Sequence, residues 1–166
     1  MKKWILLILV LALCSAACVA EADSAVVYFS CSGTTEKIAE WVAEDTGADL
    51  FRLLPKEPYT EEDLKYYTDC RADREQADDA ARPEISNLPE KLGEYDVIFL
   101  GYPIWHGKAP KIMYTLLESL DFSGKTMIPF CTSASSGMGS SATLLKALTG
   151  NTTTWLDGKR FAKTGN

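Results

Sequence analysis

Short apolar runs alternate with amphipathic and polar segments along most of the chain. Runs of strand length lie at residues 25–29, 49–54, 95–101, 126–131 and 152–156. Apolar residues recur with helical spacing at 35–45, 61–67, 110–120 and 140–148. Between the second and third strands, residues 55–94 are otherwise polar and acidic, with several prolines. This alternation predicts an α/β fold, in which helices cover both faces of a parallel sheet.

Polar, glycine-rich loops follow the first, third and fourth predicted strands, at residues 30–35, 101–109 and 132–139. In an open parallel sheet, ligands bind in the crevice at the carboxyl ends of the strands. The three loops are therefore expected to converge on one rim. The topology alone predicts a binding site there.

The first loop is rich in hydroxyl groups and leads into a predicted helix; it consists of Ser30, Cys31, Ser32, Gly33, Thr34 and Thr35. Hydroxyls and backbone amides at the start of a helix bind phosphate well. The loop contains no Lys or Arg, so it is not a Walker loop, and the chain has no G-x-G-x-x-G motif. We therefore predict a mononucleotide phosphate that is held and not cleaved. The alternative is a helix cap that merely happens to be rich in Ser and Thr.

Residues 26–35 (VVYFSCSGTT), followed by Ala39 and Val42, resemble the flavodoxin signature. Residues 95–105 and 130–133 are similar to segments of the short flavodoxin-like family of bacteria, and the resemblance extends over residues 24–161. It implies a flavodoxin-like, doubly wound five-stranded parallel sheet in the order 2-1-3-4-5. It also implies a non-covalently bound FMN and a role in electron transfer.

The resemblance further implies which residues contact FMN. The ribityl phosphate would be held by the loop from Ser30 to Thr35. The isoalloxazine ring would be flanked by Tyr102, Pro103, Ile104, Trp105 and His106. The loop from Thr132 through Ser133 to Gly137 would close over the other edge of the ring.

Two aromatic residues of the second loop can also be judged from their own chemistry. Trp105 lies in a loop, where its large apolar surface would be exposed to water unless it stacks on a flavin. The alternative is that Trp105 packs into the core. His106 is the only histidine, so the sequence gives little support for a His-based metal cluster or a Ser-His-Asp triad. We interpret His106 as a loop residue near the ring.

The chain departs from the family pattern in two places. Family members usually continue after the fifth strand with a final helix that covers one face of the sheet, and this helix is missing from the sequence. Residues 68–76 resemble a segment that usually contains Ser where this chain has Cys70. Arg71 in that segment is either a flavin contact or part of a solvated charged surface.

The charge of the chain limits its partners. With 166 residues it forms one domain or two small ones, and 17 basic against 23 acidic residues give a formal net charge of −6. Nucleic acid is excluded as a partner, because binding to phosphates needs clustered Lys and Arg. The charge favours redox partner proteins with a basic docking surface.

Residues 1–22 are typical of an export signal, and residues 23–166 would form the FMN-binding domain. Lys2 and Lys3 precede ten uncharged, mostly aliphatic residues, and small residues follow them. The apolar run is shorter than a membrane-spanning helix requires. We therefore predict an extracytoplasmic location.

Two cleavage sites compete in this leader. Ala20-Glu21-Ala22 suits ordinary signal peptidase, which would release a secreted or periplasmic protein. Ser15-Ala16-Ala17-Cys18 resembles a bacterial lipoprotein box, although Ser15 replaces the usual aliphatic residue. In that case a lipid on Cys18 would be the protein's only attachment to the membrane.

Three cysteines remain beyond the leader: Cys31, Cys70 and Cys131. An odd number excludes a complete disulfide framework, and their spacing is not that of a metal site. The sequence thus predicts an exported FMN-dependent one-electron carrier. The alternative is an FMN-dependent oxidoreductase that passes hydride between NAD(P)H and a quinone, with Tyr102, His106 or Arg71 orienting the substrate.

Overall fold

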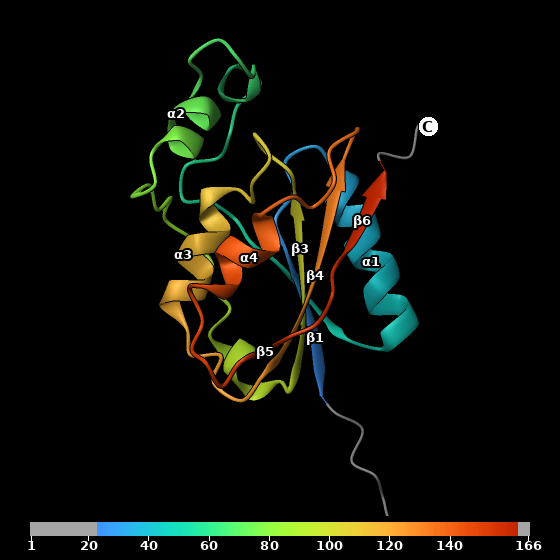
Figure 1. Ribbon diagram of the computed structural model, residues 1–166. Helices are drawn as coiled ribbons and strands as arrows, with labels where there is room; N and C mark the ends of the chain where they lie inside the picture. The colour runs from blue at the N-terminus through green and yellow to red at the C-terminus, as the bar shows by residue number, and fades with distance from the viewer. Residues whose placement is uncertain (1–22, 163–166) are drawn as a thin grey trace, which may run out of the picture.

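The computed structural model describes residues 23–162 as a twisted parallel sheet between two layers of helices (Figure 1). Its strands are β1 (Ser24–Tyr28), β2 (Asp49–Arg52), β3 (Val97–Pro103), β4 (Thr126–Ser133), β5 (Thr154–Trp155) and β6 (Lys159–Ala162). Its α-helices are α1 (Thr34–Thr46), α2 (Arg71–Ala77), α3 (Lys111–Ser119) and α4 (Ser141–Lys146). Short 3₁₀ turns, η1 (Glu62–Leu64) and η2 (Glu90–Glu94), lie between β2 and β3.

The strand order is β2-β1-β3-β4-β5, and every pairing is parallel. This order confirms the predicted flavodoxin-like fold class. The fifth position differs from the prediction, because β5 and β6 both pair with β4 and share that edge. Helix α1 lies on one face of the sheet, whereas α3 and α4 lie on the other (Figure 1).

The break between β5 and β6 falls at Gly158, where the chain runs close to its neighbours. A Cβ at this position would lie 2.5 Å from Cε of Met138 and 2.6 Å from the carbonyl oxygen of Pro129. The end of the Met138 side chain could move aside, but the Pro129 carbonyl is part of the backbone of β4, so a side chain here would force the backbone to shift. The glycine therefore allows the chain to pass close to β4 and to Met138, near the end of the third loop, before it pairs with β4 as β6.

Side chains of the central strands alternate between two apolar layers. The larger layer faces α3 and α4 and includes Val27, Leu100, Ile112 and Met127, all fully buried. The smaller layer lies under α1 and includes Val26, Tyr28, Ile38, Ala39 and Phe130, with Phe99 and Phe161 only partly buried at its margin. Phe130 packs directly on Gly101, where a Cβ would lie 2.3 Å from its Cζ atom.

The segment between β2 and β3 differs most from the sequence prediction. The helix expected at residues 61–67 is only the single turn η1, and the helix α2 was not predicted. Helix α2 has seven residues and only Ala72 and Gln76 buried, so it has no apolar stripe to detect. A capping box between Cys70 and Asp73 stabilises its start.

The predicted leader, including Cys18, lies outside the described residues. Among the residues that are described, no helix has the length and apolar character needed to span a membrane. Residues 23–162 also contain no group of three or more His, Cys, Asp or Glu side chains that could hold a metal ion.

Candidate functional site

The three predicted loops meet at the carboxyl edge of the sheet and surround two adjoining hollows of about 230 Å³ and 160 Å³. The hollows share four lining residues: Ser32, Tyr66, Pro103 and Trp105. The first also contacts the loop after β1, and the second extends to the loop after β4. Together they form one elongated site across the rim, which we call the rim site.

The first loop has the geometry of an anion cradle. Gly33 has φ of 79°, a left-handed conformation that favours glycine, and its N–H donates to Ser30 Oγ at 3.1 Å. Helix α1 starts at the next residue, so its first amide groups have no partners within the helix. The residues present therefore fit a phosphate that is held by neutral donors.

A buried hydroxyl pair ties the first loop to the third. Thr35 Oγ1 lies 2.8 Å from Thr132 Oγ1, and both residues are almost fully buried. This contact links the start of α1 to the end of β4 and so connects the two ends of the rim site.

Trp105 forms the aromatic wall of the rim site. Its indole is 4% exposed, and its ring packs edge-on against Phe29 at 5.5 Å, Tyr59 at 5.2 Å and Tyr66 at 6.2 Å between centroids. It nevertheless lines both hollows. Trp105 therefore combines the two roles that the sequence left as alternatives, core packing and a wall of the site.

The second loop turns sharply after Trp105. His106 and Gly107 both have positive φ, 48° and 77°, and Trp105 and Lys108 exchange backbone hydrogen bonds of 2.9 and 3.0 Å. Helix α2 braces this turn, because Gln76 Nε2 donates to the carbonyl oxygens of Trp105 and Ala109 at 3.0 and 3.2 Å.

A second brace joins α2 to His106. His106 Nε2 lies 2.7 Å from Asp73 Oδ1, and Tyr66 and Tyr67 pack edge-on against the imidazole ring of His106. Burial alone would raise the pKa of Asp73, but hydrogen bonds from the Tyr67 backbone, His106 and the backbones of Cys70 and Thr68 lower it to about 2. The carboxylate is therefore ionised at all ordinary pH values and stays an acceptor for His106.

The third loop is held from β6. Arg160 donates through Nε to Ser133 Oγ at 2.9 Å, and through Nη2 to the carbonyl oxygens of Ser133 and Ala134 at 3.2 and 2.9 Å. Ser133 and Ala134 line the rim site. The guanidinium thus fixes the loop backbone and places a positive charge behind this end of the site.

Most residues that the sequence nominated lie in the rim site. Ten of them line it: Ser30, Cys31, Ser32, Thr34, Thr35, Pro103, Ile104, Trp105, Thr132 and Ser133. Gly33 shapes the first loop without lining the hollows, while His106 and Gly137 lie on the surrounding loops.

The expectation for Tyr102 needs correction. Side chains alternate along β3, so the phenol points into the core, where it is fully buried and its hydroxyl lies 3.1 Å from Ser141 Oγ. It therefore lies outside the rim site. Arg71 is only partly exposed, because it pairs with Glu75 at 2.7 Å and lies over the ring of Tyr59 at 4.2 Å, and it does not line the rim site.

Several contributors were missed from the sequence. Leu64 and Tyr66 of the segment between β2 and β3 line the rim site, and Asp73, Gln76 and Arg160 brace its loops. The adjacent aromatics Tyr66 and Tyr67 in an otherwise acidic segment were the only local signal. The braces depend on tertiary contacts that no local pattern encodes.

A parallel sheet in this order, with three loops at its carboxyl edge around a hydroxyl-lined cradle and an aromatic wall, defines a flavodoxin-like protein. The chain belongs to the flavodoxin family, because the family's sequence model, described as Flavodoxin, matches residues 23–165. No curated protein matches the chain significantly.

Solved structures agree with this assignment. A candidate flavoprotein from Bacteroides eggerthii DSM 20697 is 40% identical, with a TM-score of 0.80 over 84% of this chain and 88% of that one. A candidate flavoprotein from Bacteroides uniformis ATCC 8492 is 35% identical, with a TM-score of 0.80 over 87% and 92% of the two chains. A flavoprotein from Lactobacillus acidophilus NCFM, solved in complex with FMN, is 22% identical, with a TM-score of 0.64 over 84% and 93%; this likeness concerns the fold alone.

Proposed function

We propose that this protein binds FMN non-covalently in the rim site and carries single electrons between partner proteins. The observation that carries the proposal is the first loop, a cradle of hydroxyls and free amides at the start of α1, beside the aromatic wall of Trp105. The FMN complex of the Lactobacillus protein with the same fold supports the choice of flavin. When bound, FMN supplies the redox chemistry, since the protein itself only positions and tunes such a cofactor.

Different residues of the rim site would contact different parts of FMN. Ser30, Ser32 and Thr35 would hold the phosphate through neutral donors. Trp105 would cover the flavin ring from one side and exclude water from it. Ser133, fixed by Arg160, lies at the opposite end, where the guanidinium favours added negative charge on the ligand.

The test compares FMN with riboflavin, which lacks the phosphate. Ser30→Ala combined with Thr35→Val should weaken FMN binding by at least about tenfold, because hydrogen bonds to a charged group are worth about 1.5–3 kcal/mol each. Riboflavin binding should change far less. Flavin fluorescence quenching measures both affinities, and a visible spectrum during reductive titration shows whether the bound flavin takes up electrons.

Thr46→Val is a matched control, because Thr46 is an exposed hydroxyl residue at the other end of α1 and bonds only to the Val42 carbonyl. It should leave both affinities unchanged. Equal losses for FMN and riboflavin in the double variant would refute the phosphate assignment. Steady turnover of NAD(P)H with a quinone would favour the oxidoreductase alternative over the carrier.

We also propose that the redox partners present a basic docking surface. The net charge of −6 supports this, because opposite charges steer two proteins together and speed their encounter.

Export from the cytoplasm is proposed from the leader at residues 1–22 alone. In the native host, cell fractionation should find the mature protein outside the cytoplasm. Membrane-bound protein that becomes soluble after Cys18→Ser would support the lipid anchor, and soluble protein that begins at Asp23 would exclude it. Full-length cytoplasmic protein that retains Met1 would refute export.

A further inference from the structure

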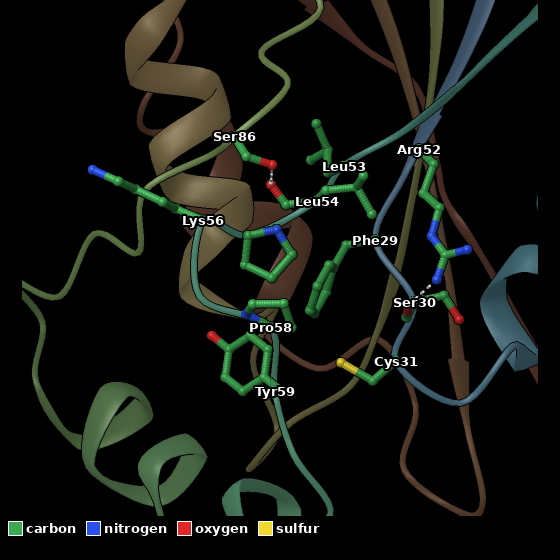
Figure 2. Close-up of a pocket in the computed structure, with 11 residues that line it drawn as sticks. Phe29, Ser30, Cys31, Arg52, Leu53, Leu54, Lys56, Pro58, Tyr59 and Ser86 are labelled. Carbon is green, nitrogen blue, oxygen red and sulfur yellow. Dashed lines mark hydrogen bonds between the residues drawn. The ribbon is translucent and has the colours of Figure 1, made fainter.

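A third hollow lies on the β2 side of the first loop, outside the rim site (Figure 2). Its volume is about 340 Å³, larger than either part of the rim site. It is lined by the ends of β1 and β2, the chain that follows β2, and Ser86. We call it the side hollow. A volume of this order suits a small organic ligand.

The lining of the side hollow is mostly apolar. Phe29 and Leu53, each 1% exposed, belong to the buried core beside the hollow, and the rings of Pro58 and Tyr59 also line it (Figure 2). Pro55 completes this apolar lining. The flat rings of Phe29 and Tyr59, with the apolar proline rings beside them, suit a planar apolar ligand better than a hydrated polar one.

The side hollow is preformed rather than dependent on a flexible loop. Residues 54–56 pair with residues 84–86: Lys56 N–H donates to the Glu84 carbonyl at 2.8 Å, and Ser86 N–H donates to the Leu54 carbonyl at 2.9 Å. In addition, Leu54 N–H donates to Asn87 Oδ1 at 2.8 Å. A ligand would therefore not have to order this wall when it binds.

Arg52 supplies a cation at one end of the side hollow. Its guanidinium lies beside the first loop, with Nη2 3.4 Å from the Ser30 carbonyl oxygen (Figure 2). Its ion pair with Glu36, 2.9 Å long, is partly exposed and therefore weak enough for a ligand to compete with it. Lys56 also lines the hollow, but its ammonium pairs outside it with Glu84 at 2.5 Å.

The residues that line the side hollow include no carboxylate, although the whole chain carries a net charge of −6. Cys31 lies where the side hollow adjoins the rim site, and burial raises the pKa of its thiol to about 11. The thiol is therefore uncharged at neutral pH. An anionic ligand would meet the Arg52 guanidinium at one end, in competition with Glu36, and no carboxylate among the lining residues.

We propose that the side hollow binds a small aromatic carboxylate, with its ring against Phe29 and Tyr59 and its carboxylate at Arg52. The site is separate from the proposed flavin site, because the packed rings of Phe29, Tyr59 and Trp105 stand between them. The two sites meet only at Ser30 and Cys31. The proposal does not depend on flavin binding.

The test uses three probes of one shape and different charge: 2-naphthoate, 2-naphthalenemethanol and 2-naphthylmethylamine. Calorimetric titration of the protein should rank them in that order, with the carboxylate binding at least about tenfold more tightly than the amine. Amide NMR shifts caused by 2-naphthoate should centre on Phe29, Leu53 and Tyr59. Equal affinity for the carboxylate and the amine, or shifts scattered outside the lining, would overturn the proposal.

Arg52→Gln should weaken 2-naphthoate binding about fivefold, whereas Arg52→Lys should restore part of the loss. Lys56→Gln is the matched control: it removes the same charge from the same segment, yet it should change the affinity less than about twofold. An Arg52→Gln effect no larger than that of Lys56→Gln would overturn the assignment of Arg52.

A final arm adds excess FMN. The affinity for 2-naphthoate should stay within about twofold of its value without flavin, because the two sites share only their border. Displacement of 2-naphthoate by FMN would show that the side hollow belongs to the flavin site and would overturn the proposal. Failure of FMN to bind would count against the proposed function, while the naphthoate result would still stand.

Discussion

Gly101→Ala is expected to lower the free energy of unfolding by about 3 kcal/mol, the upper end of the usual cost of overpacking a core. Gly101 lies in β3, the strand between β1 and β4, and the added Cβ would lie 2.3 Å from Cζ of Phe130. The ring of Phe130 is buried, with 3% of its surface exposed, so it cannot swing into solvent without losing its packing. Urea denaturation of the variant and the native protein measures the difference.

Two further variants isolate the clash. Gly93→Ala is the matched control, because its φ is not positive and a Cβ there would meet nothing within 4 Å; its effect should stay within about 0.5 kcal/mol. Phe130→Leu in the Gly101→Ala background should restore part of the lost stability, since it removes the ring that the methyl group strikes. Independent, additive effects of the two substitutions would show that Phe130 is not the cause.

Trp105→Ala is expected to damage stability and flavin binding together. Because the indole is 4% exposed and packs on three aromatic rings, its removal should cost about 3–5 kcal/mol, as is typical of a core Trp→Ala substitution. It also lines both parts of the rim site, so FMN affinity should fall as well. Urea denaturation and flavin titration at low denaturant measure the two effects separately.

Trp105→Phe should lose less stability than Trp105→Ala and retain part of the flavin affinity, since a flat ring remains in the wall. Trp41→Ala is the control for loss of a tryptophan, because Trp41 is 52% exposed on α1. It should change neither quantity appreciably. Lost stability with unchanged FMN affinity would mean that Trp105 belongs to the core alone.

The sheet could be predicted because its central strands are continuous apolar runs, such as residues 25–29, and because strand and helix alternate. The edge at β5 and β6 could not, since its short pieces are separated by a crossing at Gly158 that depends on Met138. Helix α2 also gave no hydrophobic periodicity from which to predict it, because it buries only Ala72 and Gln76.

The sequence predicts which loops form the rim site better than it predicts which side chains face it. Loops at strand ends follow from topology, which predicts that Ser32, Trp105 and Thr132 lie at one rim, and all three line the rim site. Which side chains face the crevice depends on where each strand stops alternating. Tyr102 is still within β3 and points into the core, and a motif alone cannot reveal this.

The two walls of the rim site are held in different ways. In the wall formed by the first and third loops, the buried hydroxyl pair of Thr35 and Thr132 joins the start of α1 to the end of β4. The wall that carries Tyr66 belongs to a short segment tied to the second loop through Gln76 and Asp73. Such a segment can unfold locally while the sheet remains intact. Local opening of this segment would widen the rim site while the rest of the domain stays folded.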